Sequence, residues 1–198
     1  MPQYWSSLAN PGAPWQTASG TPAATAAAVT ISPQGAGGVG DDPQVLTWWQ
    51  GMVVQVRARG VYTMGSTATT AVFSLYASAT GTAASGGTSL ATTGALSLPV
   101  SVTGFWWRLQ AEIQCRQIAS GTSTATLYTH GELLIQTATP AGTTGNIQVW
   151  PMPATSGPTA GTADSTIAHT LGLVATLSQI TGSPTITCTQ CLHEIVSG

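Results

Sequence analysis

The residues with the most evident capacity for chemistry come late in the chain, where Cys188 and Cys191 are followed closely by His193. A structural zinc site needs about four such ligands, commonly two cysteine pairs or one pair with distant histidines. Cys115 supplies a third thiol, so a set of three cysteines and one histidine is available by number. In a continuous strand, however, Cys188 and Cys191 point to opposite faces, and nothing in the sequence signals a bulge. We therefore expect buried free thiols, with no metal and no other cofactor.

Two further groups of residues have types that occur in hydrolases. Asp164, Ser165 and His169 are close in sequence, but a nucleophile and its base must lie within hydrogen-bond reach in space. Glu112 and Glu132 would have to face one cleft to hydrolyse a glycoside, and surface positions on neighbouring strands account for them better. The sequence therefore predicts that the chain is not an enzyme.

Charged residues are scarce and make up 5% of the 198 residues, against about 25% in a typical globular domain. Lysine is absent, and the basic residues are Arg57, Arg59, Arg108 and Arg116. A nearly neutral surface lacks the repulsion that keeps free proteins apart, which favours burial in an assembly over a neutral, threonine-coated soluble domain. Four arginines are too few for nucleic-acid binding, and no uninterrupted apolar stretch predicts a membrane span.

The strongest structural signal is the alternation in FWWRLQAEIQCRQ, residues 105–117. Its apolar positions predict the buried face of a strand, and its polar positions predict the outer face. Arg108, Glu112 and Arg116 then share the outer face, where they pair across strands with neighbours such as Glu132, or Arg57 and Arg59. Alternatively, this polar stripe lies against a sister subunit and sets its register by electrostatic complementarity.

Similar short segments with strand character follow one another from about residue 45 and are separated by turns rich in glycine, serine and threonine. No helical period of meaningful length competes with them. We expect seven to nine strands in an all-β, antiparallel β-sandwich over residues 45–198, of the jelly-roll type rather than a tight barrel. The expected strands lie within 51–63, 70–78, 89–98, 105–117, 123–138, 145–152, 165–179 and 183–197.

Residues 1–44 differ from the rest because proline recurs among glycine and alanine. Proline disfavours long helices and favours extended chain. We interpret the segment as an extended N-terminal arm, with Tyr4, Trp5 and Trp15 as anchors on a partner; a tail without structure is the alternative. No basic and apolar leader is visible, so we expect synthesis in the cytoplasm.

Two tryptophan pairs, Trp48–Trp49 and Trp106–Trp107, interrupt this polar composition. Neighbouring strand residues face opposite sides, so one member of each pair should be buried and the other should be outside. We assign Trp48 and Trp106 to the outside. An exposed indole suits contact with another protein chain or a carbohydrate, or cover by the chain's own arm.

The segment FWWRLQAEIQCRQIASGTSTATLYTHGELLI resembles a strand–turn–strand unit of small virion proteins of tailed bacteriophages. FSLYASATGT and AHTLGLVATLSQITGSPTITCTQCLHEIVS are similar too, so that the resemblance covers roughly residues 50–197. The family consists of jelly-roll structural proteins, and the resemblance carries no catalytic residue over to this chain.

The resemblance implies a capsid decoration (cement) or minor capsid protein that is made in the host bacterial cytoplasm and located on the capsid surface of the virion. Its partners would be itself, as a homotrimer, and the major capsid protein. A tail-associated module that binds a receptor or a carbohydrate is the alternative. The candidate contact residues are Tyr4, Trp5, Trp15, Trp48, Trp106, Arg108, Glu112 and Arg116.

Overall fold

The computed structural model describes residues 18–20, 28–30, 47–79, 87–138, 146–154, 159–167, 169–179 and 181–197. Within these ranges every regular element is a β-strand, and no helix is long and apolar enough to cross a bilayer. The strands are β1 (Ala18–Gly20), β2 (Ala28–Thr30), β3 (Val53–Met64), β4 (Thr69–Ser78), β5 (Thr88–Thr92), β6 (Leu96–Leu98), β7 (Val102–Ile118), β8 (Thr124–Gln136), β9 (Ile147–Met152), β10 (Thr159–Asp164), β11 (Thr170–Leu177) and β12 (Thr185–Ser197).

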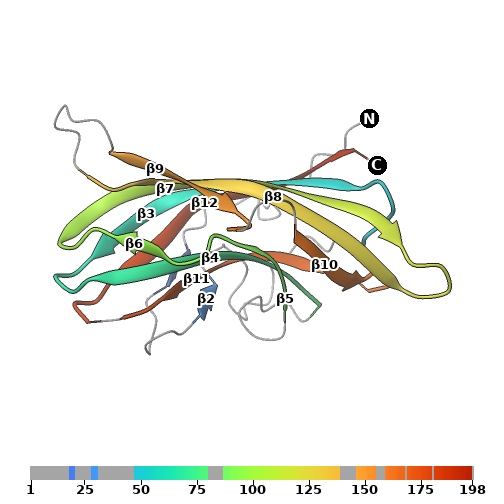
Figure 1. Ribbon diagram of the computed structural model, residues 1–198, viewed down its shortest axis with the longest axis horizontal. Helices are drawn as coiled ribbons and strands as arrows, with labels where there is room; N and C mark the ends of the chain where they lie inside the picture. Colours follow the sequence, from blue (N-terminus) through green and yellow to red (C-terminus); the bar gives the residue numbers. More distant parts are fainter. Residues whose placement is uncertain are drawn as a thin grey trace, which may run out of the picture.

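The strands form two antiparallel sheets that lie one above the other (Figure 1). The seven-stranded sheet has the order β1-β12-β3-β7-β8-β10, and β9 pairs with the same long strand β8. The five-stranded sheet has the order β2-β11-β4-β5, and β6 also pairs with β4. The expected class, an all-β antiparallel sandwich, is therefore confirmed.

The core lies between the sheets and is built from one side of each strand. In β7 the apolar positions predicted from the alternation, from Trp107 to Cys115, are all buried. From the other sheet Phe73 packs on Trp107, with ring centroids 5.4 Å apart and planes inclined by 55°. Aromatic pairs of this kind add to the stabilisation that burial of apolar area provides.

Room for Trp107 comes from Gly60, which lies directly opposite it on β3. A Cβ atom at Gly60 would lie 2.7 Å from Cζ2 of Trp107 and 1.8 Å from the carbonyl oxygen of Thr187. The second contact is with the backbone of β12, which a rotamer change cannot relieve. Gly60 therefore lets three neighbouring strands and a buried indole approach closely.

Two strands come from the segment that the sequence predicts to be an arm. β1 pairs with β12 through Ala18↔Cys188, and β2 pairs with β11 through Val29↔Ala175. These parts of residues 1–44 thus extend the sheets of the sandwich itself. Tyr4, Trp5 and Trp15 lie outside the described residues, and their role as anchors stays a prediction.

Candidate functional site

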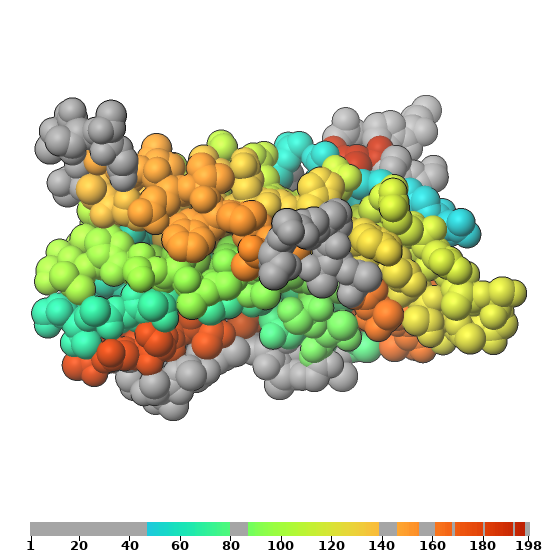
Figure 2. Space-filling view, viewed as in Figure 1, coloured from blue at the N-terminus to red at the C-terminus, as the bar shows by residue number. Residues whose placement is uncertain are grey.

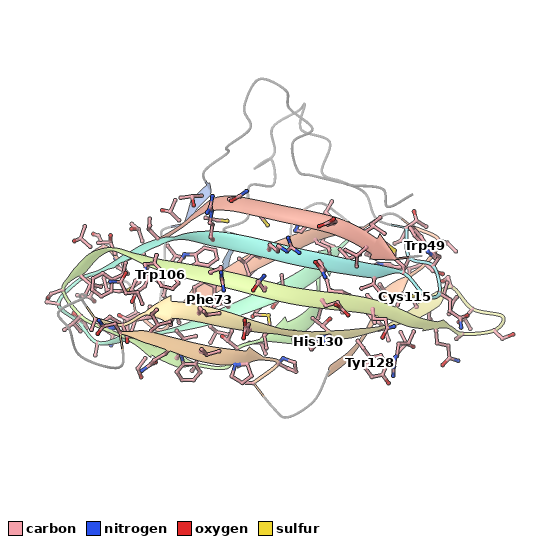
Figure 3. The ribbon with its side chains drawn as sticks, turned by 90° about the horizontal axis from the view of Figure 1, so that it is seen from above. Trp49, Phe73, Trp106, Cys115, Tyr128 and His130 are labelled. Carbon is pink, nitrogen blue, oxygen red and sulfur yellow. The ribbon has the colours of Figure 1, made fainter. Side chains whose placement is uncertain are left out.

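The outer face of the large sheet carries nearly all the charge of the described residues. All four arginines and all three glutamates of the chain lie on β3, β7, β8 and β12, together with His130. The strands of the small sheet contain no charged residue. We call the outer surface of β12, β3, β7 and β8 the charged face; Figure 3 looks down on it. Its members are Arg57, Arg59, Arg108, Arg116, Glu112, Glu132, Glu194 and His130.

Strand register arranges these charges in rows across the sheet. One row runs Glu194–Gln55–Glu112–His130 from β12 to β8. The next row of outward-facing residues contains Arg57, Gln110 and Glu132. In the row after that, Arg59 lies opposite Arg108. The face therefore changes from acidic to basic along the strands.

Of the cross-strand neighbours predicted for Arg108, Arg59 lies opposite it but Glu132 does not, because the register places Arg108 between Arg59 and Leu134. No hydrogen-bond or ion-pair partner among the described residues meets the guanidinium of Arg59 or of Arg108. Like charges directly opposite each other in a sheet are destabilising. The structure thus holds two exposed cations together without compensation from the described part of the chain.

The other two arginines of the charged face have neutral partners. Arg57 donates a hydrogen bond of 2.7 Å to Oε1 of Gln55. Arg116 is the extra residue of a bulge between Cys115 and Gln117; its Nε donates to Oε1 of Gln114 at 3.1 Å. Its guanidinium carbon lies 5.3 Å from the ring centroid of Tyr128, within cation–π range.

Each tryptophan pair has one buried and one exposed member, as expected. Trp106 is 37% exposed on the charged face and Trp107 is fully buried, which matches the assignment. The assignment of the first pair is wrong, because Trp48 is 1% exposed and Trp49 is 40% exposed. Trp48 shares its even parity with the inward residues Met52 and Val54, a signal that was available in the sequence.

Two shallow depressions hollow the charged face. One, of about 260 Å³, lies over the acidic row and is lined by residues that include Gln55, Glu112 and His130. The other, of about 330 Å³, lies at the basic end. Its lining includes Arg59, Trp106, Arg108, Leu134 and Thr189. In Figure 3 Trp106 and Tyr128 lie toward opposite ends of the sheet, with His130 between them.

An exposed apolar strip borders the basic end, and no prediction from the sequence included it. Val61 on β3 lies directly opposite Trp106 and is 38% exposed. Ile147 and Val149 on β9 are also exposed, and Val149 pairs with Leu134. β9 forms part of the molecular surface in Figure 2. The alternation of IQVWPM is the signal that could have revealed this strip.

The expectation that Cys188 and Cys191 face opposite sides is wrong, because β12 contains a bulge between Cys188 and Gln190. The extra residue, Thr189, returns both cysteines to the buried face. A hydrogen bond with Cys188 and burial raise the pKa of Cys191, which favours the thiol over a thiolate. No group of three or more potential metal ligands is found in the part of the chain that the structure describes.

His193 also faces inward on β12, opposite Val56, and its Nε2 lies 3.5 Å from Sγ of Cys191. Burial lowers the pKa of His193 to about 4. The imidazole is therefore neutral at physiological pH and packs as a polar residue at the edge of the core.

The candidate hydrolase residues make hydrogen bonds to nearby turn residues and to the β7–β8 turn. Asp164 accepts hydrogen bonds from N and Oγ1 of Thr166 at 2.8 and 2.7 Å. Ser165 donates to the carbonyl oxygen of Ser123 at 2.8 Å, and Nδ1 of His169 lies 3.0 Å from the carbonyl oxygen of Ile167. Ser165 and His169 are thus each engaged with a backbone carbonyl, in an arrangement typical of a structural turn.

Together these observations define an antiparallel β-sandwich with one charged, partly apolar face suited to binding. Comparisons with protein-family models, with curated proteins and with solved structures give no match. The chemistry of the charged face therefore carries the functional argument.

Proposed function

We propose that this chain is a structural virion protein of the capsid decoration (cement) type, which binds the outer capsid surface as a homotrimer. The observation that carries the proposal is the concentration of the arginines and glutamates on one face of one sheet. A protein that needed charge only for solubility would spread it over both sheets. A one-sided face of mixed charge suits a partner of fixed orientation and register.

The strand order supports a jelly-roll topology for this protein. The first described strand pairs with the last, and the second pairs with the one before the last. The resulting orders, β1-β12-β3-β7 and β2-β11-β4-β5, correspond to those expected of two interlocked Greek keys with β8, β9 and β10 added beside β7, which supports the proposal. Sandwiches of this type are common in virion proteins.

The mechanical role follows from several contacts that act together. A trimer would present three charged faces, and the second and third contacts form at high effective concentration once the first has formed. A protein that binds only the assembled shell stabilises that shell by mass action. The proposal thus needs no catalytic group.

The test is association of the purified chain with phage particles of its own source, measured by co-sedimentation and by electron microscopy of the complexes. We expect density on the capsid and a higher capsid disruption temperature. Removal of residues 1–16 keeps β1 and β2 and tests whether Tyr4, Trp5 and Trp15 anchor the chain; we expect weaker association with unchanged folding. Absence of the chain from the capsid of intact particles would overturn the proposal.

A second candidate is a carbohydrate-binding module, favoured by the exposed Trp106 beside a depression of about 330 Å³. Sugar rings stack on exposed indoles of this kind. Glycan-array binding that is lost in Trp106→Ser and kept in Trp49→Ser would favour it. Trp49 is a matched control because it is similarly exposed but is not part of that depression.

A further inference from the structure

We propose that Arg59, Arg108 and Trp106 form a subsite for a carboxylate-bearing protein segment. The inference rests on the proposed function and names the chemistry of the partner surface: acidic side chains next to apolar ones. It is carried by two guanidinium groups that have no partner among the described residues, by the depression that they line, and by the apolar strip beside it.

The first step is the placement of the arginines. Arg59 and Arg108 are a directly opposed pair of β3 and β7, and both are exposed. The flanking positions are Gln190 on β12 and Leu134 on β8, neither of which carries charge. An anion placed between the two guanidinium groups would relieve their repulsion. Each planar guanidinium group can donate two parallel hydrogen bonds to a carboxylate, so the pair suits one or two carboxylates.

The second step is the shape of the surface around the pair. The depression of about 330 Å³ opens between the arginines and Trp106, and Gly60 contributes to its lining without a side chain. The Thr189 bulge also contributes, and its Oγ1 donates to the carbonyl oxygen of Arg59 at 3.1 Å. A protein segment can insert a side-chain carboxylate into a hollow of this size, which it could not do on a flat sheet surface.

The third step is the support of Trp106. Its backbone N–H donates to Oε1 of Gln136 at 3.4 Å, and Nε2 of Gln136 donates to the carbonyl oxygen of Ala138 at 3.0 Å. Tyr62 donates to the carbonyl oxygen of Gln136 from below the sheet. This network holds the strand that presents the exposed indole, so less conformational freedom is lost when a partner binds.

The fourth step distinguishes a protein from other anions. Val61, Leu134, Ile147 and Val149 continue the surface of Trp106 with aliphatic side chains, which match apolar residues of a protein. A polyanion such as a nucleic acid requires many more cations than two. An acidic oligosaccharide would use the arginines and the indole but would leave the aliphatic strip uncovered.

The experiment is titration of the full chain with the peptide acetyl-Asp-Leu-Glu-Leu-Asp-Leu-Glu-amide, followed by the NMR signals of the arginine Nε–H groups. The comparison probes are the same peptide with Asn and Gln in place of the acids, and a hyaluronan hexasaccharide. We expect the acidic peptide to shift the Arg59 and Arg108 signals and its affinity to fall with salt.

The matched variants separate charge from geometry. Arg59→Gln/Arg108→Gln should weaken binding about tenfold or more. Arg59→Lys/Arg108→Lys should retain part of the wild-type affinity, because it keeps the positive charges but lacks the paired hydrogen-bond donors of guanidinium. Arg57→Gln should weaken binding no more than about twofold, through the loss of long-range attraction alone. Thermal unfolding checks that each variant remains folded.

Equal binding of the uncharged peptide, unchanged affinity of Arg59→Gln/Arg108→Gln, or preference for the hexasaccharide would each overturn the inference. Particle co-sedimentation distinguishes this failure from failure of the proposed function. If the double variant still decorates particles as the wild type does, the subsite is wrong and the proposed function stands. If the wild type binds the peptide but no particle, the subsite stands and the proposed function fails.

Discussion

At the scale of single residues, the inward-facing His193 makes stability depend on pH. Burial lowers its pKa from 6.5 to about 4. As the pH falls, His193 therefore becomes protonated in the unfolded chain at a higher pH than in the folded state. As the pH falls from about 6.5 to about 4, the unfolded state therefore gains protons and the free energy of unfolding decreases. Below the pKa of about 4 that His193 has in the folded state, this residue causes no further loss of stability.

We predict that His193→Gln reduces this acid-induced loss by about 2 kcal/mol. The measurement is urea unfolding at pH 7 and at pH 4.5. His169, whose pKa burial also lowers, contributes in the same direction, so a smaller acid effect should remain in the variant. The same acid dependence in variant and wild type would show that His193 is not the responsible group.

Gly60 supports a second prediction at this scale. Gly60→Ala should lower the free energy of unfolding by about 3 kcal/mol, because its Cβ would overlap the backbone of Thr187 and the ring of Trp107. Gly161→Ala is the matched control. Its Cβ would first meet the flexible end of Leu90, at 3.1 Å, and should have a much smaller effect. Chemical denaturation measures both, and equal losses would contradict the account.

At the scale of elements, the Thr189 bulge sets which residues of β12 face the core. Deleting Thr189 would leave Cys188, Gln190 and Cys191 in regular alternation, so residues 190–197 would keep their faces and their register with β3. We expect Cys191 to stay buried and the free energy of unfolding to fall by at most about 1 kcal/mol, because only the bulge and the hydrogen bond from Thr189 are lost. Thr189→Gly keeps the extra residue and loses only the hydrogen bond to Arg59, so it should remain close to wild type.

Thermal unfolding and the rate of thiol labelling of the native protein test this prediction. Labelling should stay slow in both variants, since all three cysteines are buried in the wild type and keep their faces. Rapid labelling of the deletion variant, or a loss of more than about 3 kcal/mol, would mean that residues 190–197 had turned over.

The same strand shows what could and could not be predicted from the sequence. The alternation of residues 105–117 predicted β7 correctly, because every second side chain of a half-buried strand faces water and the others face the core. The bulges at Arg116 and Thr189 have no signature in residue type, and so the faces of Cys188 and Cys191 were misassigned. β10, which reads TAGTAD, lacks the large apolar residues that indicate a strand.

Other elements were predicted in part. Residues 89–98, expected as one kinked strand, form β5 and β6, which separate near Gly94 with φ of 68° and both pair with β4. Ile167, expected in a strand with Leu171, is exposed in the turn before β11. β1 and β2 have three residues each, too few for any periodic signal. For the candidate site, exposure of Trp106 and Arg108 was predictable, whereas the Arg59–Arg108 register depends on long-range pairing.

At the scale of the whole molecule, uneven charge bears on association. The small sheet has no charged strand residue, and net charge is −2, so little repulsion opposes contact between copies. We predict a particle of three chains, with a mass about three times the 20.0 kDa of one chain, in light scattering after size exclusion at low salt. A monomer at all concentrations tested would contradict the homotrimer.

The pairing of β1 and β3 with β12 has a consequence for biosynthesis. β12 leaves the ribosome after every other described strand, yet it sits between two of the earliest. Until it is released, β3 exposes a bare edge of hydrogen-bonding groups, and the large sheet cannot close. The nascent chain therefore keeps this edge unpaired until β12 is made, and an unpaired strand edge is prone to aggregation during that interval.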